Sequence, residues 1–103
     1  NLFKNPDGAQ EIINDIIKEA KTMDAQSISQ LSHSMKNRLD NSDLIRKHHS
    51  DIIIIQGKDD RIMTKHSMQE KIGALKPEYH EVNSGHMSWH ESPTEISNII
   101  CKL

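Results

Sequence analysis

The apolar residues of the first 48 positions recur at the spacing of amphipathic helices. Asp7 or a neighbour is placed to cap a first helix, and Asp24 to cap a second one. The link 40–43 is rich in turn residues, and a short helical turn follows it. The apolar positions at helical spacing are Ala9, Ile12, Ile13, Ile16, Ile17 and Ala20 in the first helix, a narrower stripe of Ile28, Leu31, Met35 and Leu39 in the second, and Leu44 and Ile45 in the turn. The isoleucines at 12, 13, 16 and 17 are expected to form core contacts or contacts between a cap and a core.

Beyond residue 48 the pattern changes to strand, turn, helix, strand, loop and helix. Residues 51–56 form a β-branched run without alternation, which is typical of a parallel strand buried on both faces, and Gly57 is expected to end it. Thr64 is placed to cap a helix with Met68, Ile72 and Leu75 on its apolar face. Residues 79–82 alternate as a second strand, and a loop is expected over 83–91. A capping box of Ser92 and Glu95, with Pro93 between them, marks the start of the last helix.

This order predicts an α/β fold, because a helix that joins two neighbouring strands implies a right-handed parallel crossover. Two parallel strands need further strands on their edges and cover on both faces. We therefore expect another segment or a second copy of the chain to cover the sheet edge. Two parts are predicted, a helical segment over 1–42 and an α/β segment over 43–103.

Composition and charge exclude several classes of protein. The formal net charge of −2 gives no electrostatic reason to expect a nucleic acid or an anionic membrane as partner. The longest apolar run, 52–55, is far too short to span a membrane. The start lacks the features of a secretory signal, and Cys101 is the only cysteine. We expect a cytoplasmic protein without a cofactor, with Cys101 as a small buried side chain.

Two polar residues follow the carboxyl ends of the two predicted strands, where parallel sheets carry their ligand-binding and catalytic groups. Asp60 follows the first predicted strand by four residues, and His86 follows the second by four. The carboxyl ends of adjacent parallel strands lie at one edge of the sheet, which brings these loops together. A carboxylate there can accept the Nδ1 proton of His86 and leave Nε2 free to take a proton from a nucleophile. Asp60 and His86 are therefore the candidate catalytic residues.

From about residue 43 onward the chain resembles the C-terminal segment of an α/β-hydrolase. The resemblance rests on the strand followed by Gly57-x-x-Asp60, the next helix and strand, and Gly85-His86 with Glu91 and Pro93 after it. It implies that Asp60 is the acid and His86 the general base of a catalytic triad, acting on a small ester-like substrate. It also implies that residues 1–42 are the end of a helical cap. Because residue 1 is Asn rather than Met, we expect a piece of a longer protein.

The sequence departs from that family at the nucleophile. The family places its serine in Gly-x-Ser-x-Gly, whereas the four glycines of this chain stand at positions 8, 57, 73 and 85. No two of them are four residues apart, and Ser84 and Ser88 lie in a loop without identifiable oxyanion donors. We therefore expect the chain alone to be inactive as a serine hydrolase.

Two alternatives remain open. The chain could be a non-catalytic interaction module that self-associates through its sheet edge and apolar helix faces. It could also bind zinc through His86, His90 and Glu91, although a capping box at residue 92 places the two histidines in a loop. Otherwise Glu91 is expected to support the His86 loop by hydrogen bonding. Trp89 is either pocket lining or a packing anchor, and Asp59 is expected to be solvated.

Overall fold

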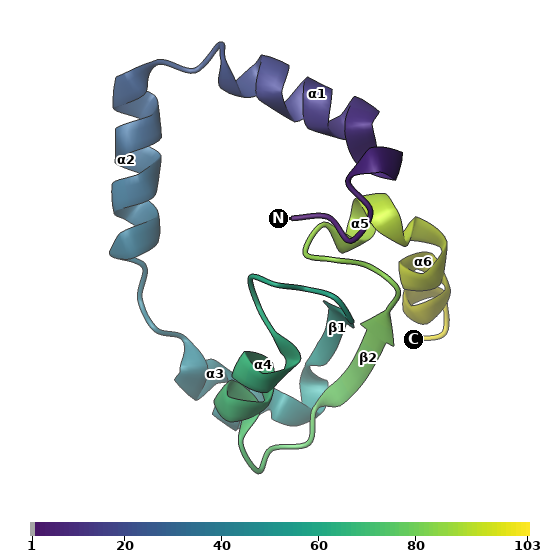
Figure 1. Ribbon diagram of the computed structural model, residues 1–103. Coiled ribbons are helices and arrows are strands. Elements are labelled where there is room, and N and C mark those ends of the chain that lie inside the picture. The colour runs from purple at the N-terminus through teal and green to yellow at the C-terminus, as the bar shows by residue number, and fades with distance from the viewer. Residues whose placement is uncertain (1) are drawn as a thin grey trace.

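The computed structural model describes residues 2–103, which form a mixed α/β arrangement with a two-stranded parallel sheet (Figure 1). The α/β class predicted from the sequence is thus confirmed. In chain order the elements are η1 (Asp7–Ala9), α1 (Gln10–Ala20), α2 (Ala25–Lys36), α3 (Ser42–His48), η2 (His49–Asp51), β1 (Ile53–Gly57), α4 (Lys65–Ile72), β2 (Glu78–Val82), α5 (Ser88–Glu91) and α6 (Pro93–Cys101).

The sheet pairs β1 with β2 in parallel, and α4 forms the crossover between them. The register runs from Ile53 opposite Glu78 to Gly57 opposite Val82. The predicted first strand begins two residues too early, because Asp51 belongs to the short turn η2. Gly57 is the last residue of β1, whereas the sequence pattern predicts that the strand ends before it. Within residues 2–103 no third strand pairs with the free edge of either strand.

Side-chain caps fix the starts of two helices as predicted. Asp24 accepts a hydrogen bond from the backbone N–H of Ser27 at 2.8 Å, and Thr64 accepts one from that of Ser67 at 3.1 Å. Asp7 does not cap α1 but begins the turn η1. No side chain caps η1 or α1, so the predicted cap is wrong, although Asn5 Oδ1 accepts a hydrogen bond from Gly8 N at 3.2 Å.

The predicted capping box at α6 is wrong, although the helix does begin at Pro93. Ser92 Oγ donates to the carbonyl of Asn83 at 2.9 Å, and Glu95 accepts from the backbone N–H of Asn83 at 3.3 and 3.4 Å. Both side chains therefore bind the loop that follows β2 rather than the end of their own helix. The reason is the proximity of that loop, whose backbone groups also need partners.

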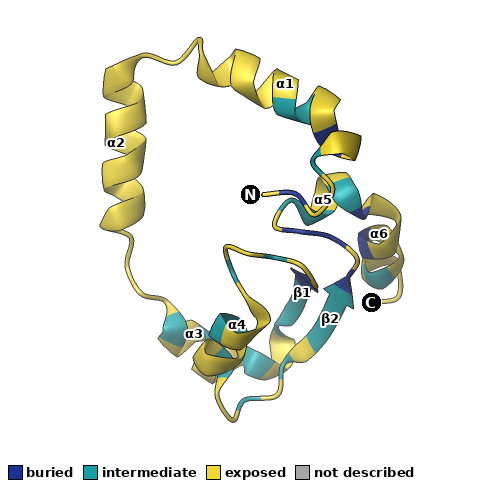
Figure 2. Cartoon of the chain, viewed as in Figure 1, coloured by how far each residue is buried: buried dark blue, intermediate teal, exposed yellow. Residues whose placement is uncertain are grey.

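The buried part of the chain is small and lies near the strand ends (Figure 2). The buried apolar residues are Phe3, Ala9, Val82 and Ile96. Ile16 and Ile17 do not join a core within residues 2–103, because α1 runs away from the sheet and leaves them 39% and 45% exposed. A contact between a cap and a core outside this chain stays a prediction. The stripe predicted for the second helix is also exposed, and its last member, Leu39, lies beyond the end of α2 at Lys36. Cys101, predicted to be buried, is exposed as well.

The chain exposes more surface than a compact domain of its mass. Its accessible area is 8147 Å², against about 5,900 Å² for a folded monomer of this size. Its radius of gyration is 16.1 Å, against about 13 Å for a compact domain of this length. Helices α1 and α2 form an arc beside the α/β part and account for much of this extension (Figure 1). None of the helices in residues 2–103 combines the length and the apolar character that crossing a membrane requires.

Candidate functional site

Asp60 is held in the turn that follows β1. The backbone N–H of Asp60 donates to the carbonyl of Gly57 at 3.2 Å, which closes the turn. Its carboxylate oxygen Oδ1 then accepts from the N–H groups of Ile62 and Met63, each at 2.9 Å. These local bonds are typical of aspartate in turns, and they leave the second oxygen, Oδ2, for a partner outside the turn.

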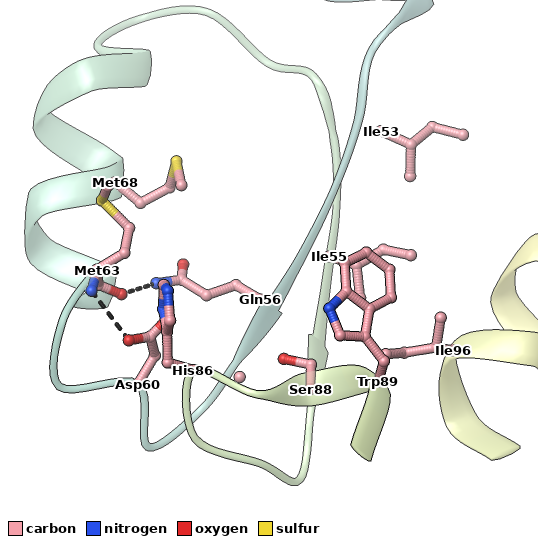
Figure 3. Close-up of a pocket in the computed structure, with 11 residues that line it drawn as sticks. Ile53, Ile55, Gln56, Asp60, Met63, Met68, His86, Ser88, Trp89 and Ile96 are labelled. Atoms are coloured by element: carbon pink, nitrogen blue, oxygen red, sulfur yellow. Dashed lines mark hydrogen bonds and ion pairs between the residues drawn. The ribbon is translucent and has the colours of Figure 1, made fainter. Parts of the chain in front are cut away.

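That partner is His86, in the loop that follows β2. Its Nδ1 donates to Asp60 Oδ2 at 2.9 Å (Figure 3). The Asp60 side chain is only 8% exposed, whereas the His86 side chain is 40% exposed. The two residues predicted from the sequence are thus brought together across 26 positions of the chain. With Nδ1 engaged, Nε2 is the ring nitrogen that remains for a third group.

The electrostatics of the pair favour an ionised aspartate. Burial alone would raise the pKa of the Asp60 carboxyl, because it disfavours the charged form. The hydrogen bonds from His86, Met63 and Ile62 outweigh burial and lower the pKa of Asp60 below its ordinary value. Asp60 is therefore a carboxylate near neutral pH, able to fix the tautomer of His86 and to stabilise its protonated form.

Backbone contacts bring the two loops this close. Beyond the sheet, Lys58 N donates to the carbonyl of Val82 at 2.9 Å, and Asp59 N donates to that of Ser84 at 3.0 Å. Gly57 makes the approach possible, because a Cβ there would lie only 2.1 Å from the carbonyl oxygen of Gly85. Ser84 is fully buried at the contact, and its hydroxyl bonds to the Gly85 carbonyl and to Ser88 Oγ.

Glu91 supports the His86 loop, as expected. Its carboxylate accepts from the N–H of Gly85 at 2.7 Å, from that of Lys4 at 3.0 Å and from that of Asn5 at 2.9 Å. Burial alone would raise the pKa of Glu91, but these backbone bonds and the charge of Lys4 outweigh it and lower the pKa below its ordinary value. The side chain therefore ties the N-terminal residues to the loop that carries His86.

The N-terminal residues 2–5 contribute contacts to the candidate site that the helix pattern does not predict. Met87 N donates to the carbonyl of Leu2 at 3.1 Å, and Phe3 is buried. Lys4 Nζ forms an ion pair with Asp59 at 3.0 Å, so Asp59, although half exposed, is paired rather than simply solvated. Residues 2–5 thus contact both candidate loops. Their pattern carries no periodicity that could have revealed this role.

A mostly apolar cavity of about 440 Å³ adjoins the pair (Figure 3). Asp60, His86 and Ser88 line one part of it. Trp89 is one of its lining residues and is 70% exposed, so it is pocket lining rather than a buried anchor. The apolar lining comes from β1, from the region of α4, and from α5 and α6, and comprises Ile53, Ile55, Met63, Met68, Trp89 and Ile96.

Neither a nucleophile nor a metal site completes the pair within the described part of the chain. No serine, threonine or cysteine of residues 2–103 hydrogen bonds to His86, and Ser84 and Ser88 bond to each other instead. No group of three or more metal-ligating side chains lies together in these residues, which gives no support to the zinc alternative. His90 lies in the short helix α5, where the sequence pattern predicts a loop, so that prediction is wrong.

Gln56, in β1, also lies next to the site, although the sequence pattern did not single it out. Its side-chain amide lies between the hydroxyl of Tyr79 and the carbonyl of Met63. The available signal was a single polar side chain at the end of an otherwise apolar strand.

Comparison of the chain with family models, with curated proteins and with solved structures found no match.

Proposed function

We propose that this chain is the C-terminal portion of a serine-type α/β-hydrolase, in which Asp60 is the triad acid and His86 the general base. The observation that carries the proposal is the 2.9 Å bond between His86 Nδ1 and Asp60 Oδ2 at the carboxyl ends of adjacent parallel strands. The mostly apolar cavity beside His86 supports a small ester-like substrate. Residues 1–42 would be the end of the cap above that site.

In the proposed reaction, His86 Nε2 removes the proton of a serine hydroxyl supplied by a segment outside this chain. The serine oxygen attacks the acyl carbon of the ester, and the proton passes from His86 to the alcohol as the carbon–oxygen bond breaks. Water then repeats the sequence on the acyl-enzyme and regenerates the serine. Asp60 stays ionised throughout, orienting the imidazole and stabilising its charged form.

The segment that supplies the serine would also cover the free edge of the sheet. The edge of β1 that faces away from β2 has no strand partner within residues 2–103, and Ile53 and Ile55 are only partly buried. A parallel strand on this edge would satisfy the free backbone groups and cover apolar side chains. A nucleophile at its carboxyl end would then stand at the same edge of the sheet as His86.

The test uses the protein as the cell makes it, captured with antibodies raised against this chain. Intact-mass spectrometry determines whether the material is longer than the 11.8 kDa of this chain or contains a second polypeptide. Hydrolysis of p-nitrophenyl acetate and labelling by a fluorophosphonate probe then report the serine. We expect His86→Ala to lower hydrolysis by at least about a thousandfold.

A matched control is His66→Ala, because the His66 side chain is 83% exposed and lies on α4. This variant should retain full activity. The isolated 103-residue chain should neither hydrolyse the ester faster than free imidazole nor take up the probe. Full activity in His86→Ala, or probe labelling of the isolated chain, would refute the proposal.

The surface of the chain favours a second candidate, an interaction module without catalysis. Thirteen large apolar side chains are exposed in residues 2–103, eight of them on helices, and a strand edge is unpaired. Surface of this kind marks interaction sites. Sedimentation velocity of the isolated chain distinguishes the two candidates. A stable homodimer, together with no esterase activity in any longer form of the protein, supports the interaction module. A monomer argues against it.

A further inference from the structure

Gln56 forms a buried bridge beneath the turn that carries Asp60. The residue lies in β1 and is only 4% exposed. Its Oε1 accepts a hydrogen bond from the hydroxyl of Tyr79, in β2, at 2.5 Å. Its Nε2 donates to the backbone carbonyl of Met63 (Figure 3). A single side chain thus joins the neighbouring strand to the turn 58–63.

The direction of both hydrogen bonds is fixed by chemistry. A carbonyl only accepts, so the amide nitrogen must face Met63 and the amide oxygen must face Tyr79. The phenol then has to be the donor. Burial and the nearby Glu81 carboxylate raise the pKa of Tyr79, which keeps that proton in place at neutral pH. Only glutamine, with a donor and an acceptor at the same distance, completes this bridge without rearrangement.

The bridge ends at Met63, three residues after Asp60 in the chain, and Met63 is joined to the Asp60 carboxylate by a hydrogen bond. Met63 accepts from Gln56 through its carbonyl and donates to Asp60 Oδ1 through its N–H at 2.9 Å. Asp60 Oδ2 in turn accepts from His86 Nδ1 at 2.9 Å. The backbone of Met63 thus joins the hydrogen bonds from Tyr79 to those that end at His86.

We propose that Gln56 is a positioning residue, which holds the turn at Met63 so that Asp60 keeps His86 in the Nδ1–H tautomer. This inference rests on the proposed function, because the tautomer matters only if His86 is a general base. Gln56 acts through the turn rather than on a substrate. Supporting groups of this kind fix the orientation of a reactive side chain.

The test is a two-bond ¹H–¹⁵N spectrum of the full chain, which distinguishes the two neutral tautomers of histidine. It is recorded at a pH where the imidazoles are neutral, and the His86 signals are assigned by their loss in His86→Gln. We expect a pure Nδ1–H pattern in the parent chain. Gln56→Glu keeps the shape but removes the donor to Met63, and should turn that pattern into a mixture of tautomers.

The matched control is Gln69→Glu, which makes the same chemical change on the exposed surface of α4 and should leave the His86 pattern unchanged. If Gln56→Glu does not fold, Tyr79→Phe removes only the hydroxyl and should produce the mixture in weaker form. A merely structural role would lower the unfolding midpoint while His86 kept its pure pattern.

The outcomes separate this inference from the proposed function. A pure Nδ1–H pattern that survives both Gln56→Glu and Tyr79→Phe would overturn the role of Gln56 and leave the Asp60–His86 pair intact. A parent chain in which His86 is already a mixture or an Nε2–H tautomer would refute the pair itself, and with it the proposed function.

Discussion

Replacing Gly57 by alanine should separate the loops that carry Asp60 and His86. The added Cβ would lie 2.1 Å from the carbonyl oxygen of Gly85 and 2.5 Å from that of Ser84. Ordinary contact begins near 3.4 Å, so the backbone at Gly85 must retreat by about 1.3 Å. Unlike a flexible side chain, this backbone is also fixed by hydrogen bonds.

A movement of that size breaks the contacts between the strand ends. The bond from Asp59 N to the carbonyl of Ser84 is 3.0 Å long and would pass well beyond hydrogen-bonding distance, as would the 2.9 Å bond between His86 and Asp60. Overpacking costs about 1–3 kcal/mol, and each lost hydrogen bond adds about 1 kcal/mol. We therefore expect the free energy of unfolding to fall by about 3–5 kcal/mol in Gly57→Ala.

The measurement combines urea unfolding with amide hydrogen exchange, because exchange at Asp59 reports the contact between the loops directly. The control is Gly8→Ala, whose Cβ meets only the flexible side chain of Asn5, at 2.7 Å. It should change unfolding by less than about 1 kcal/mol. The reasoning is wrong if Gly57→Ala matches that control in stability and keeps the protection of the Asp59 amide.

Three further predictions follow from single side chains. Glu91→Gln removes a charged acceptor of three backbone N–H groups and should lower the free energy of unfolding by about 2–4 kcal/mol in urea; a loss below about 1 kcal/mol contradicts this. Because the pKa of Asp60 is lowered in the folded chain, its stabilising contribution is complete above about pH 4, the ordinary carboxyl range, and disappears as the pH falls through the lowered value. Asp60→Asn should therefore unfold with a flatter acid dependence, and an unchanged slope would refute this. Thr64→Ala should cost about 1 kcal/mol through loss of the α4 cap, measured by thermal unfolding, whereas Thr94→Ala in the first turn of α6 should cost less.

The sequence predicted the parts of the fold that depend on local chemistry. The strands, the crossover helix and the caps at Asp24 and Thr64 follow from β-branched runs and from short-range hydrogen bonds. The meeting of Asp60 and His86 could also be predicted, because parallel topology brings two consecutive strand ends to one edge.

What the sequence did not reveal depends on contacts between distant residues. Ser92 and Glu95 match a capping box, but both bind Asn83, since the local pattern carries no information about a loop that folds against it. The isoleucines of α1 have a core-facing spacing, yet whether they are covered depends on what packs there. Gln56 looked unremarkable because its partners stand 7 and 23 residues away.

The buried part of this chain is concentrated at its candidate site. Val82 and Ser84 are fully buried next to the loop of His86, and Gln56 and Ser92 are buried around them, whereas the apolar faces of α1 and α2 are exposed. The packing that positions the pair therefore comes from residues 2–9 and from the strand ends, all within this chain. Under the proposed function, a partner that covered the free edge of β1 would add a nucleophile to a base already oriented and would not need to create that geometry. For this reason the tautomer of His86 in the isolated chain is the most direct measure of whether the site exists before any partner binds.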